Sequence, residues 1–306
     1  MPDLTPQQLL GIAHGMRSDY TAVSAAAAGS PDPMAHVTDI VIPTVDARRE
    51  LPARLYVPDS AAEEPNGLPV VLFAHGGGFN SGNLDTHDVL ARAIALRSGA
   101  LVLAVDYRLA PEHPYPAAPD DLYTALNWVA GNAQDIGADP DRIAVAGDSA
   151  GGNLVAALAM LTRDRGGPAL VAQWLMYATL SNRMDTPSWK QLGDTHMPTR
   201  AMNAIVIASY VPSQLSPFDP RIAPLWGEHH DLPPTLLQVG ELDPLRDENI
   251  AYAAAIHDAG GRAEVIVYPG NAHGFLQFFK NKHSSPDGQR ALEYGVQFLR
   301  ASFDRP

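Results

Sequence analysis

The 306-residue sequence contains no cysteine. Disulfide bonds, thiolate catalysis and cysteine-ligated zinc are therefore excluded. Basic residues are also scarce, since 21 Lys and Arg stand against 34 Asp and Glu and give a formal net charge of −13. Such a charge repels phosphate backbones and anionic membrane surfaces, so nucleic acid is not an expected partner.

Long hydrophobic runs are missing as well. No stretch reaches the ~18 apolar residues that a membrane helix needs, so we expect no stable membrane anchor. Residues 1–6 contain no basic leader, which makes a cytoplasmic location the default expectation. With 46% hydrophobic and 18% charged side chains, the composition is that of a globular chain with a large core.

The most informative motif is Gly147-Asp148-Ser149-Ala150-Gly151, which follows an apolar run over residues 142–146. A serine on a sharp turn between a strand and a helix takes strained backbone angles, and Gly147 and Gly151 remove the Cβ atoms that would clash there. Free N–H groups at the start of the following helix favour negative charge beside Ser149. Small residues often match this pattern by chance, so the interpretation as a nucleophile needs an oxyanion loop, an acid and a histidine elsewhere.

A glycine-rich segment provides the first of these. The apolar run over residues 68–74 predicts a buried strand, and it leads into His75-Gly76-Gly77-Gly78-Phe79. Consecutive glycines allow the backbone to approach a ligand and to point N–H groups at an oxyanion. A flexible turn is the structural alternative, and a phosphate-binding loop is disfavoured because no Gly-Lys-Ser/Thr follows. The pairing with Ser149 favours an oxyanion loop.

Several blocks of the chain resemble the bacterial hormone-sensitive lipase family (family IV) of α/β-hydrolase esterases. The resemblance spans roughly residues 35–305. Its blocks are residues 75–79, residues 107–117, residues 147–152, and residues 243–247 followed by residues 273–275.

This resemblance implies an enzyme without a cofactor, a serine carboxylesterase that hydrolyses short- to medium-chain acyl esters through an acyl-enzyme intermediate. It places the oxyanion donors at the backbone N–H groups of Gly77, Gly78 and Ala150. His75 is implied to shape the loop rather than to do chemistry, and Gly76 and Asp148 are further residues that support the motif. Relatives often pair along the sheet edge near residues 263–268, which implies a homodimer.

The catalytic order in α/β-hydrolases is serine, acid, histidine. Asp243 follows a predicted strand over residues 235–239 and matches the family's Asp-Pro-Leu pattern. Glu241 and Asp247 are rivals by proximity, although Asp247 fits better as a helix start. His273 follows the strand-like run 263–268 and a predicted loop over residues 269–272. We therefore predict that Ser149, Asp243 and His273 form a catalytic triad.

Apolar runs alternate with helix-like stretches along most of the chain. This alternation predicts an α/β-hydrolase fold with a mostly parallel central sheet and helices on both faces. Residues 37–42 and 53–57, joined through residues 46–48, resemble an antiparallel hairpin that leads into the sheet. Arg108 and Glu112 are candidates for an ion pair within the loop that follows residues 101–105.

By resemblance, residues 1–35 and 181–225 form a helical cap over a core made of residues 36–180 and 226–306. Large apolar side chains near the nucleophile suit small apolar ligands. The same side chains suit the interior of the cap equally well. Those we single out for an acyl pocket are Phe79, Trp189, Met197 and Met202.

Two other functions stay open at this point. A binding protein on the same fold is the first alternative, because relatives can lose a catalytic residue, although the whole predicted triad is present here. An amidase or peptidase is the second, since the same triad serves it. Residues 228–231 contain metal-ligand types, but adjacent side chains rarely converge on one ion, so we predict no metal site.

Overall fold

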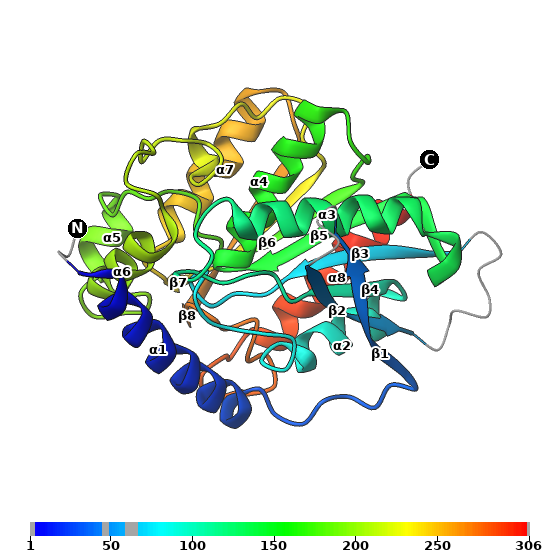
Figure 1. The fold of residues 1–306 in the computed structure, drawn as a ribbon, viewed down its shortest axis with the longest axis horizontal. Coiled ribbons are helices and arrows are strands. Elements are labelled where there is room, and N and C mark those ends of the chain that lie inside the picture. Colours follow the sequence, from blue (N-terminus) through cyan, green and yellow to red (C-terminus); the bar gives the residue numbers. More distant parts are fainter. Residues whose placement is uncertain (1–3, 45–48, 59–66, 305–306) are drawn as a thin grey trace.

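The computed structural model describes residues 4–44, 49–58 and 67–304. In that part of the chain eight strands form one sheet, in the order β1-β2-β4-β3-β5-β6-β7-β8 (Figure 1). Their bounds are β1 (His36–Pro43), β2 (Glu50–Val57), β3 (Leu68–Ala74), β4 (Leu101–Val105), β5 (Ala138–Asp148), β6 (Ala172–Met176), β7 (Thr235–Leu242) and β8 (Ala263–Ala272).

The helices alternate with the strands from β3 onward. Short 3₁₀ turns cover Gln134–Ile136 and Pro224–Trp226. The α-helices of the described ranges are α1 (Pro6–Ala27), α2 (Asp88–Ser98), α3 (Ala117–Gly131), α4 (Ala150–Arg165), α5 (Pro187–Leu192), α6 (Arg200–Tyr210), α7 (Arg246–Asp258) and α8 (Gly288–Phe303).

The first strands form the predicted hairpin. β1 pairs with β2 in antiparallel register, from His36 opposite Val57 to Pro43 opposite Glu50. The predicted junction over residues 46–48 lies outside the described residues. β2 is antiparallel to β4, and every later pairing in the sheet is parallel. The expectation of a mostly parallel central sheet is confirmed.

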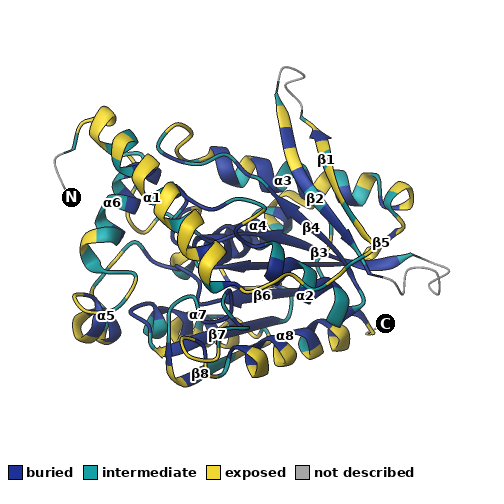
Figure 2. Ribbon diagram, turned by 90° about the horizontal axis from the view of Figure 1, so that it is seen from below, coloured by how far each residue is buried: buried dark blue, intermediate teal, exposed yellow. Residues whose placement is uncertain are grey.

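Each central strand is buried on both faces, as parallel strands usually are. In β3, Val70 and Leu72 join a core cluster with α3, α4 and α7, whereas Val71 and Phe73 face the opposite cluster with α2 and α8. This alternation follows from the two-residue period of a strand. Figure 2 shows the result, with buried strands between partly exposed helices.

Two local predictions are wrong. Residues 269–272 are not a loop, because β8 continues through them and Ala272 pairs with Leu242 across an irregularity in the register. Arg108 does not pair with Glu112. Arg108 binds Asp121, a fully buried carboxylate that needs a cation, and Glu112 binds Arg17 of α1 instead.

The topology brings the predicted site residues to one edge of the sheet. His75 follows β3, Ser149 follows β5, Asp243 follows β7 and His273 follows β8. These four strands are parallel, so their carboxyl ends lie at the same edge, which is where open α/β sheets bind ligands. Helices α1, α5 and α6 gather at one end of the molecule in both ribbon views (Figures 1 and 2).

Candidate active site

The turn between β5 and α4 has the strained geometry expected of a nucleophile elbow. Ser149 has φ 54° and ψ −117°, values that non-glycine residues rarely adopt. A Cβ atom on Gly151 would overlap the carbonyl oxygen of Ala74. Backbone hydrogen bonds hold the turn, since Ser149 N–H donates to Met176 O at 2.9 Å and Thr179 N–H donates to Ser149 O at 3.1 Å.

Two hydrogen bonds connect the predicted triad. His273 Nδ1 lies 2.8 Å from Asp243 Oδ2, and His273 Nε2 lies 3.0 Å from Ser149 Oγ. The Asp243 side chain is fully buried, and its Oδ1 accepts the N–H of Leu245 at 2.9 Å. An N–H at Nδ1 directed to the carboxylate leaves Nε2 free to accept the serine proton.

The rival acids point elsewhere. Glu241 Oε2 accepts the N–H of Gly270 at 2.9 Å, and Asp247 Oδ2 accepts the N–H of Ser188 at 2.7 Å. Helix α7 begins at Arg246, so Asp247 lies within its first turn and not at its N-cap, which is Leu245. Only Asp243, among these three carboxylates, contacts His273 in the described structure.

The glycine loop lies against the elbow. Gly76 N–H donates to Asp148 Oδ1 at 2.7 Å, which ties the loop to the residue before Ser149. Gly77 then takes φ 124°, a conformation that glycine adopts without penalty. Within the described residues, the N–H groups of Gly77, Gly78 and Ala150 donate to no acceptor. They are therefore available to an oxyanion beside the serine.

A buried polar cluster, made of His75, His87, Tyr107 and Asp148, packs against this loop. Tyr107 Oη donates to His75 O at 2.6 Å, and the two rings stack with centroids 4.3 Å apart. Burial, with the nearby His87, lowers the pKa of His75 to about 4, so its ring is neutral at pH 7. Burial opposes ionisation of Asp148, yet His87 Nε2 at 3.1 Å and the Gly76 N–H hold the pKa of Asp148 below its usual range.

The predicted pocket residues lie in different surroundings. Phe79 is nearly buried and stacks on Tyr210 of α6 with centroids 3.9 Å apart. Trp189 is fully buried in α5, and its indole N–H donates to Glu248 Oε2 at 3.3 Å. Met197 is 49% exposed, whereas Met202 is half-buried in α6. Their contact with substrate stays a prediction.

Sequence reasoning did not identify Tyr177, which contacts the predicted base. Its ring lies edge-on to His273 with centroids 4.8 Å apart, and its hydroxyl oxygen accepts the N–H of Gln277 at 3.0 Å. Tyr177 has φ 39°, which is rare for an aromatic residue. The residue ends the apolar run 171–177, and nothing in that run marked it as part of a site.

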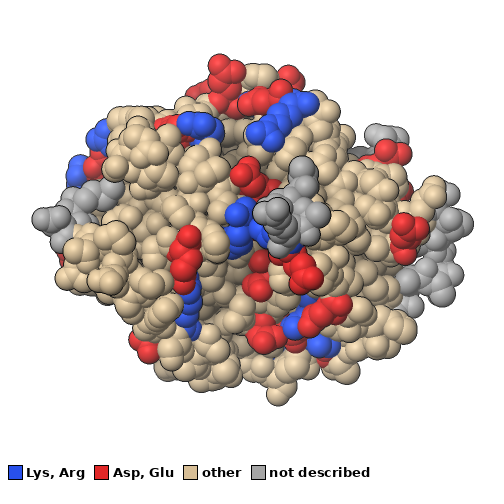
Figure 3. All heavy atoms as spheres, in the orientation of Figure 1, with Lys and Arg blue, Asp and Glu red and all other residues tan. Residues whose placement is uncertain are grey.

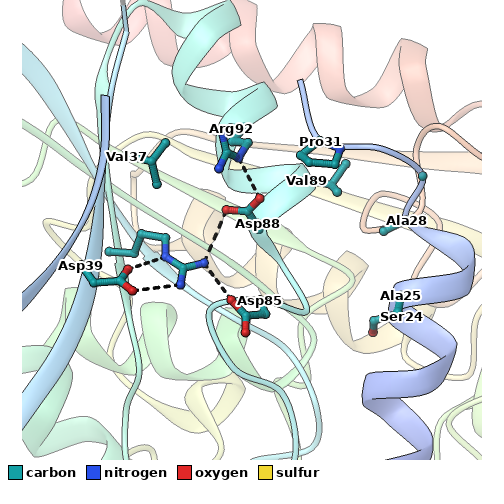
Figure 4. A pocket seen from close by; sticks show the side chains of 12 residues that line it. Ser24, Ala25, Ala28, Pro31, Val37, Asp39, Asp85, Asp88, Val89 and Arg92 are labelled. Carbon is teal, nitrogen blue, oxygen red and sulfur yellow. Dashed lines mark hydrogen bonds and ion pairs between the residues drawn. The ribbon is translucent and has the colours of Figure 1, made fainter. Parts of the chain in front are cut away.

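A cavity of about 550 Å³ lies elsewhere, between the end of α1, β1, β2 and α2 (Figure 4). Its charged side chains bind one another: Arg54 pairs with Asp39, Asp85 and Asp88, and Arg92 also pairs with Asp88. None of the predicted site residues lines it. On the face drawn in Figure 3, acidic and basic side chains are likewise interspersed.

Two further findings concern metals and membranes. Residues 4–44, 49–58 and 67–304 contain no group of three or more His, Asp or Glu side chains arranged to hold a metal ion. His230, within the segment 228–231, instead binds Glu228 and Asp231. No helix in the described part of the chain has the length and apolar character to cross a membrane.

Comparison with known proteins identifies the family. The sequence model of the alpha/beta hydrolase fold family matches residues 71–277. Carboxylesterase NlhH of Mycobacterium tuberculosis is 44% identical over 237 residues, which cover 76% of this chain and 73% of NlhH. Carboxylic ester hydrolase LipN of the same species is 40% identical over 284 residues, covering 90% of this chain and 73% of LipN.

Solved structures agree with these relatives. The crystal structure of EstE1, a thermophilic carboxylesterase cloned from a metagenomic library, has a TM-score of 0.87, 34% identity and 99% coverage of both chains. The chain belongs to the alpha/beta hydrolase fold family. Within that family it is a carboxylic ester hydrolase of the hormone-sensitive lipase type, as its sequence motifs predicted.

Proposed function

We propose that Ser149, His273 and Asp243 hydrolyse short- to medium-chain acyl esters through an acyl-enzyme intermediate. Ser149 Oγ attacks the ester carbonyl while His273 Nε2 takes its proton, and Asp243 orients the imidazole and stabilises its charged form. His273 then returns the proton to the leaving alkoxide oxygen as the alcohol departs. A water molecule, deprotonated by His273, attacks the acyl carbon. The bond between the acyl carbon and Ser149 Oγ then breaks, His273 returns the proton to Oγ, and the carboxylic acid leaves.

One observation carries this proposal. The hydrogen-bonded chain from Asp243 through His273 to Ser149 has lengths of 2.8 and 3.0 Å, which is within the reach of proton transfer. The free N–H groups of the glycine loop and of Ala150 lie next to it and supply donors for the charge that develops on the carbonyl oxygen. A binding protein without catalytic activity does not require this alignment of Asp243, His273 and Ser149.

We infer the preference for short to medium acyl chains from the proposed cap, residues 1–35 and 181–225. Its helix α6 packs directly on the oxyanion loop, since a Cβ atom on Gly78 would lie 2.9 Å from Val206 Cγ2. The stacked rings of Phe79 and Tyr210 form a second contact between the oxyanion loop and α6. We therefore expect a long acyl chain to require a movement of α6 that a short chain does not.

The direct test compares p-nitrophenyl acetate, butyrate, octanoate and palmitate as substrates for the wild type and for Ser149→Ala. We expect turnover to peak at acetate to octanoate and to fall by about 10⁶-fold in the variant, because the nucleophile is lost. The matched control is Ser209→Ala, which removes a serine hydroxyl that donates to Ile205 O of its own helix. Wild-type turnover surviving in Ser149→Ala would exclude Ser149 as the nucleophile.

The same assay separates the alternatives. A binding protein gives no p-nitrophenol release in either form, and an amidase cleaves p-nitroanilides of the same acyl groups at comparable rates. Pairing of two copies along β8 stays a prediction; it is supported by the place of β8 at the end of the strand order. A cytoplasmic location also stays a prediction.

A further inference from the structure

The loop that carries the predicted acid needs support from outside itself. Asp243 and Pro244 lead directly into α7, whose N-cap residue is Leu245. Leucine has no side-chain acceptor, and the N-cap makes no side-chain hydrogen bond to the first turn. Helix starts leave N–H groups unpaired, so such a helix needs a cap from another segment.

Ser188 of α5 provides this cap. Its Oγ accepts the N–H of Asp247 at 3.2 Å, and its own N–H donates to Asp247 Oδ2 at 2.7 Å. The two bonds reproduce the reciprocal pattern of a capping box, in which one residue caps a helix and is capped in return. Here the two partners are 59 residues apart in the sequence.

A third bond of Ser188 reaches the residue beside the acid. Ser188 Oγ–H donates to Pro244 O at 2.7 Å, and the Ser188 side chain is fully buried. Pro244 is bonded directly to Asp243, whose carboxylate is held by the Leu245 N–H and contacts His273. Any shift of the Pro244 peptide therefore moves the carboxylate relative to the imidazole.

The surrounding contacts keep Ser188 in place. Thr186 caps α5 by accepting the N–H of Trp189, and its hydroxyl lies 3.1 Å from Ser188 Oγ. The Trp189 indole N–H donates to Glu248, the next residue of α7 after Asp247. Helix α5 is thus fastened to the first turn of α7 at two successive positions.

We propose that Ser188, a residue of the cap segment, is a positioning residue for the catalytic acid. It acts through the Pro244 peptide and the first turn of α7, and it touches neither the substrate nor the reacting atoms. The inference rests on the proposed function, because it assigns Asp243 as the acid. If so, the cap segment has two roles: it lies over the triad, and through Ser188 it also helps to position Asp243.

The test measures kcat and KM for p-nitrophenyl butyrate in the wild type, Ser188→Ala, Ser188→Thr and the control Ser209→Ala, each normalised by phosphonate titration of active sites. We expect Ser188→Ala to lower kcat by about 10- to 100-fold, because small misplacements of a catalytic group cost up to about 10²-fold. KM should change by less than about threefold, and Ser188→Thr, which keeps the hydroxyl, should recover most of kcat. Ser209→Ala should turn over like the wild type.

A second readout separates positioning from simple loss of stability. A displaced carboxylate stabilises the imidazolium less, so the acidic limb of the kcat/KM profile should move to lower pH in Ser188→Ala. A destabilised but correctly arranged enzyme keeps the wild-type profile. Unchanged kcat in Ser188→Ala, or an equal fall in Ser209→Ala, would overturn the inference.

If Ser188→Ala does not fold, Asp247→Ala is measured in its place. It removes the acceptor of the Ser188 N–H and leaves the Ser188 hydroxyl, so we expect a smaller fall in kcat, about 3- to 10-fold, with KM nearly unchanged. A wild-type kcat there contradicts the inference. If the wild type itself releases no p-nitrophenol from any ester, the proposed function fails, whereas an active wild type with an unaffected Ser188→Ala removes only this inference.

Discussion

Replacing Glu248 with glutamine is expected to change how the stability of the protein depends on pH. The Glu248 carboxyl is fully buried in the first turn of α7. Three N–H groups, from Leu180, Ser181 and Trp189, donate to its two oxygens and lower its pKa. Burial outweighs them and, with a small contribution from Asp243, raises the pKa of Glu248 from 4.5 to about 8.

The sign of the effect follows from proton linkage. Because the pKa is higher in the folded protein, the folded state holds a proton that the unfolded chain releases between about pH 4.5 and pH 8. The stabilisation is complete below pH 4.5 and is lost as the pH rises through this window. At 1.36 kcal/mol per pH unit, the loss reaches about 5 kcal/mol above pH 8. Domains are typically stable by only about 5–15 kcal/mol, so the change is large.

Glutamine is neutral at every pH and removes this loss. Its oxygen can still accept the N–H groups of Leu180 and Ser181, but its NH₂ group then faces the indole N–H of Trp189. One buried donor loses its acceptor, which costs about 1–3 kcal/mol. Glu248→Gln should therefore be less stable than the wild type at pH 5 by about 1–2 kcal/mol and more stable at pH 9 by about 3 kcal/mol.

Urea unfolding of both proteins at intervals from pH 5 to pH 9 measures this difference. Glu293→Gln, at an exposed position on α8, is the matched control and should follow the wild type at each pH. The two stability curves should cross near pH 6. A difference that does not vary with pH, or a wild type that is the more stable protein at pH 9, would refute the reasoning.

Two further variants test the support of the oxyanion loop. Asp148→Asn keeps an acceptor for the Gly76 N–H but removes the charge beside His87, so we expect about 2–4 kcal/mol less stability at pH 7 and a lower kcat. Because the pKa of Asp148 lies below its usual range, urea titrations should show this difference vanishing only below about pH 3.8. Arg17→Ala removes the bidentate pair with Glu112 and two hydrogen bonds to the carbonyl oxygens of Asn80 and Ala110, and it should cost about 1–3 kcal/mol. NMR titration should then find the pKa of Glu112, held at about 2 by Arg17, returning toward 4.5, and an unchanged pKa would contradict the pairing.

The strands and the predicted catalytic residues could be inferred from the sequence because their signals are local. The run 68–74 coincides with β3, and Leu101–Val105 coincides with β4. Each site residue follows such a run after a short intervening segment, so parallel pairing brings Ser149, Asp243 and His273 to one edge. Proline and glycine at residues 269–270 also gave a local signal, for a turn, and they lie in the irregularity between the pairs Gly240–Tyr268 and Leu242–Ala272, so β8 bends there without ending.

The residues that hold the site in place give no such signal. Ser188 caps a helix that begins 58 positions later, and Arg17 reaches Glu112 across 95 positions. Neither residue belongs to a periodic pattern or to a motif that predicts its partner. The same holds for Asp121, a fully buried carboxylate that binds Arg108, whereas Glu112 does not.

Two acidic residues, Asp243 just before α7 and Glu248 in its first turn, lie close enough to interact electrostatically, and their environments differ. Asp243 presents a carboxylate to His273, with one N–H from Leu245 to hold it. Glu248 lies five residues later, and burial raises its pKa to about 8, so at pH 7 it is mostly neutral. At pH 7 Glu248 therefore adds little negative charge beside the Asp243 carboxylate. A charged Glu248 would repel the Asp243 carboxylate, which the proposed triad needs in its charged form to stabilise the imidazolium of His273.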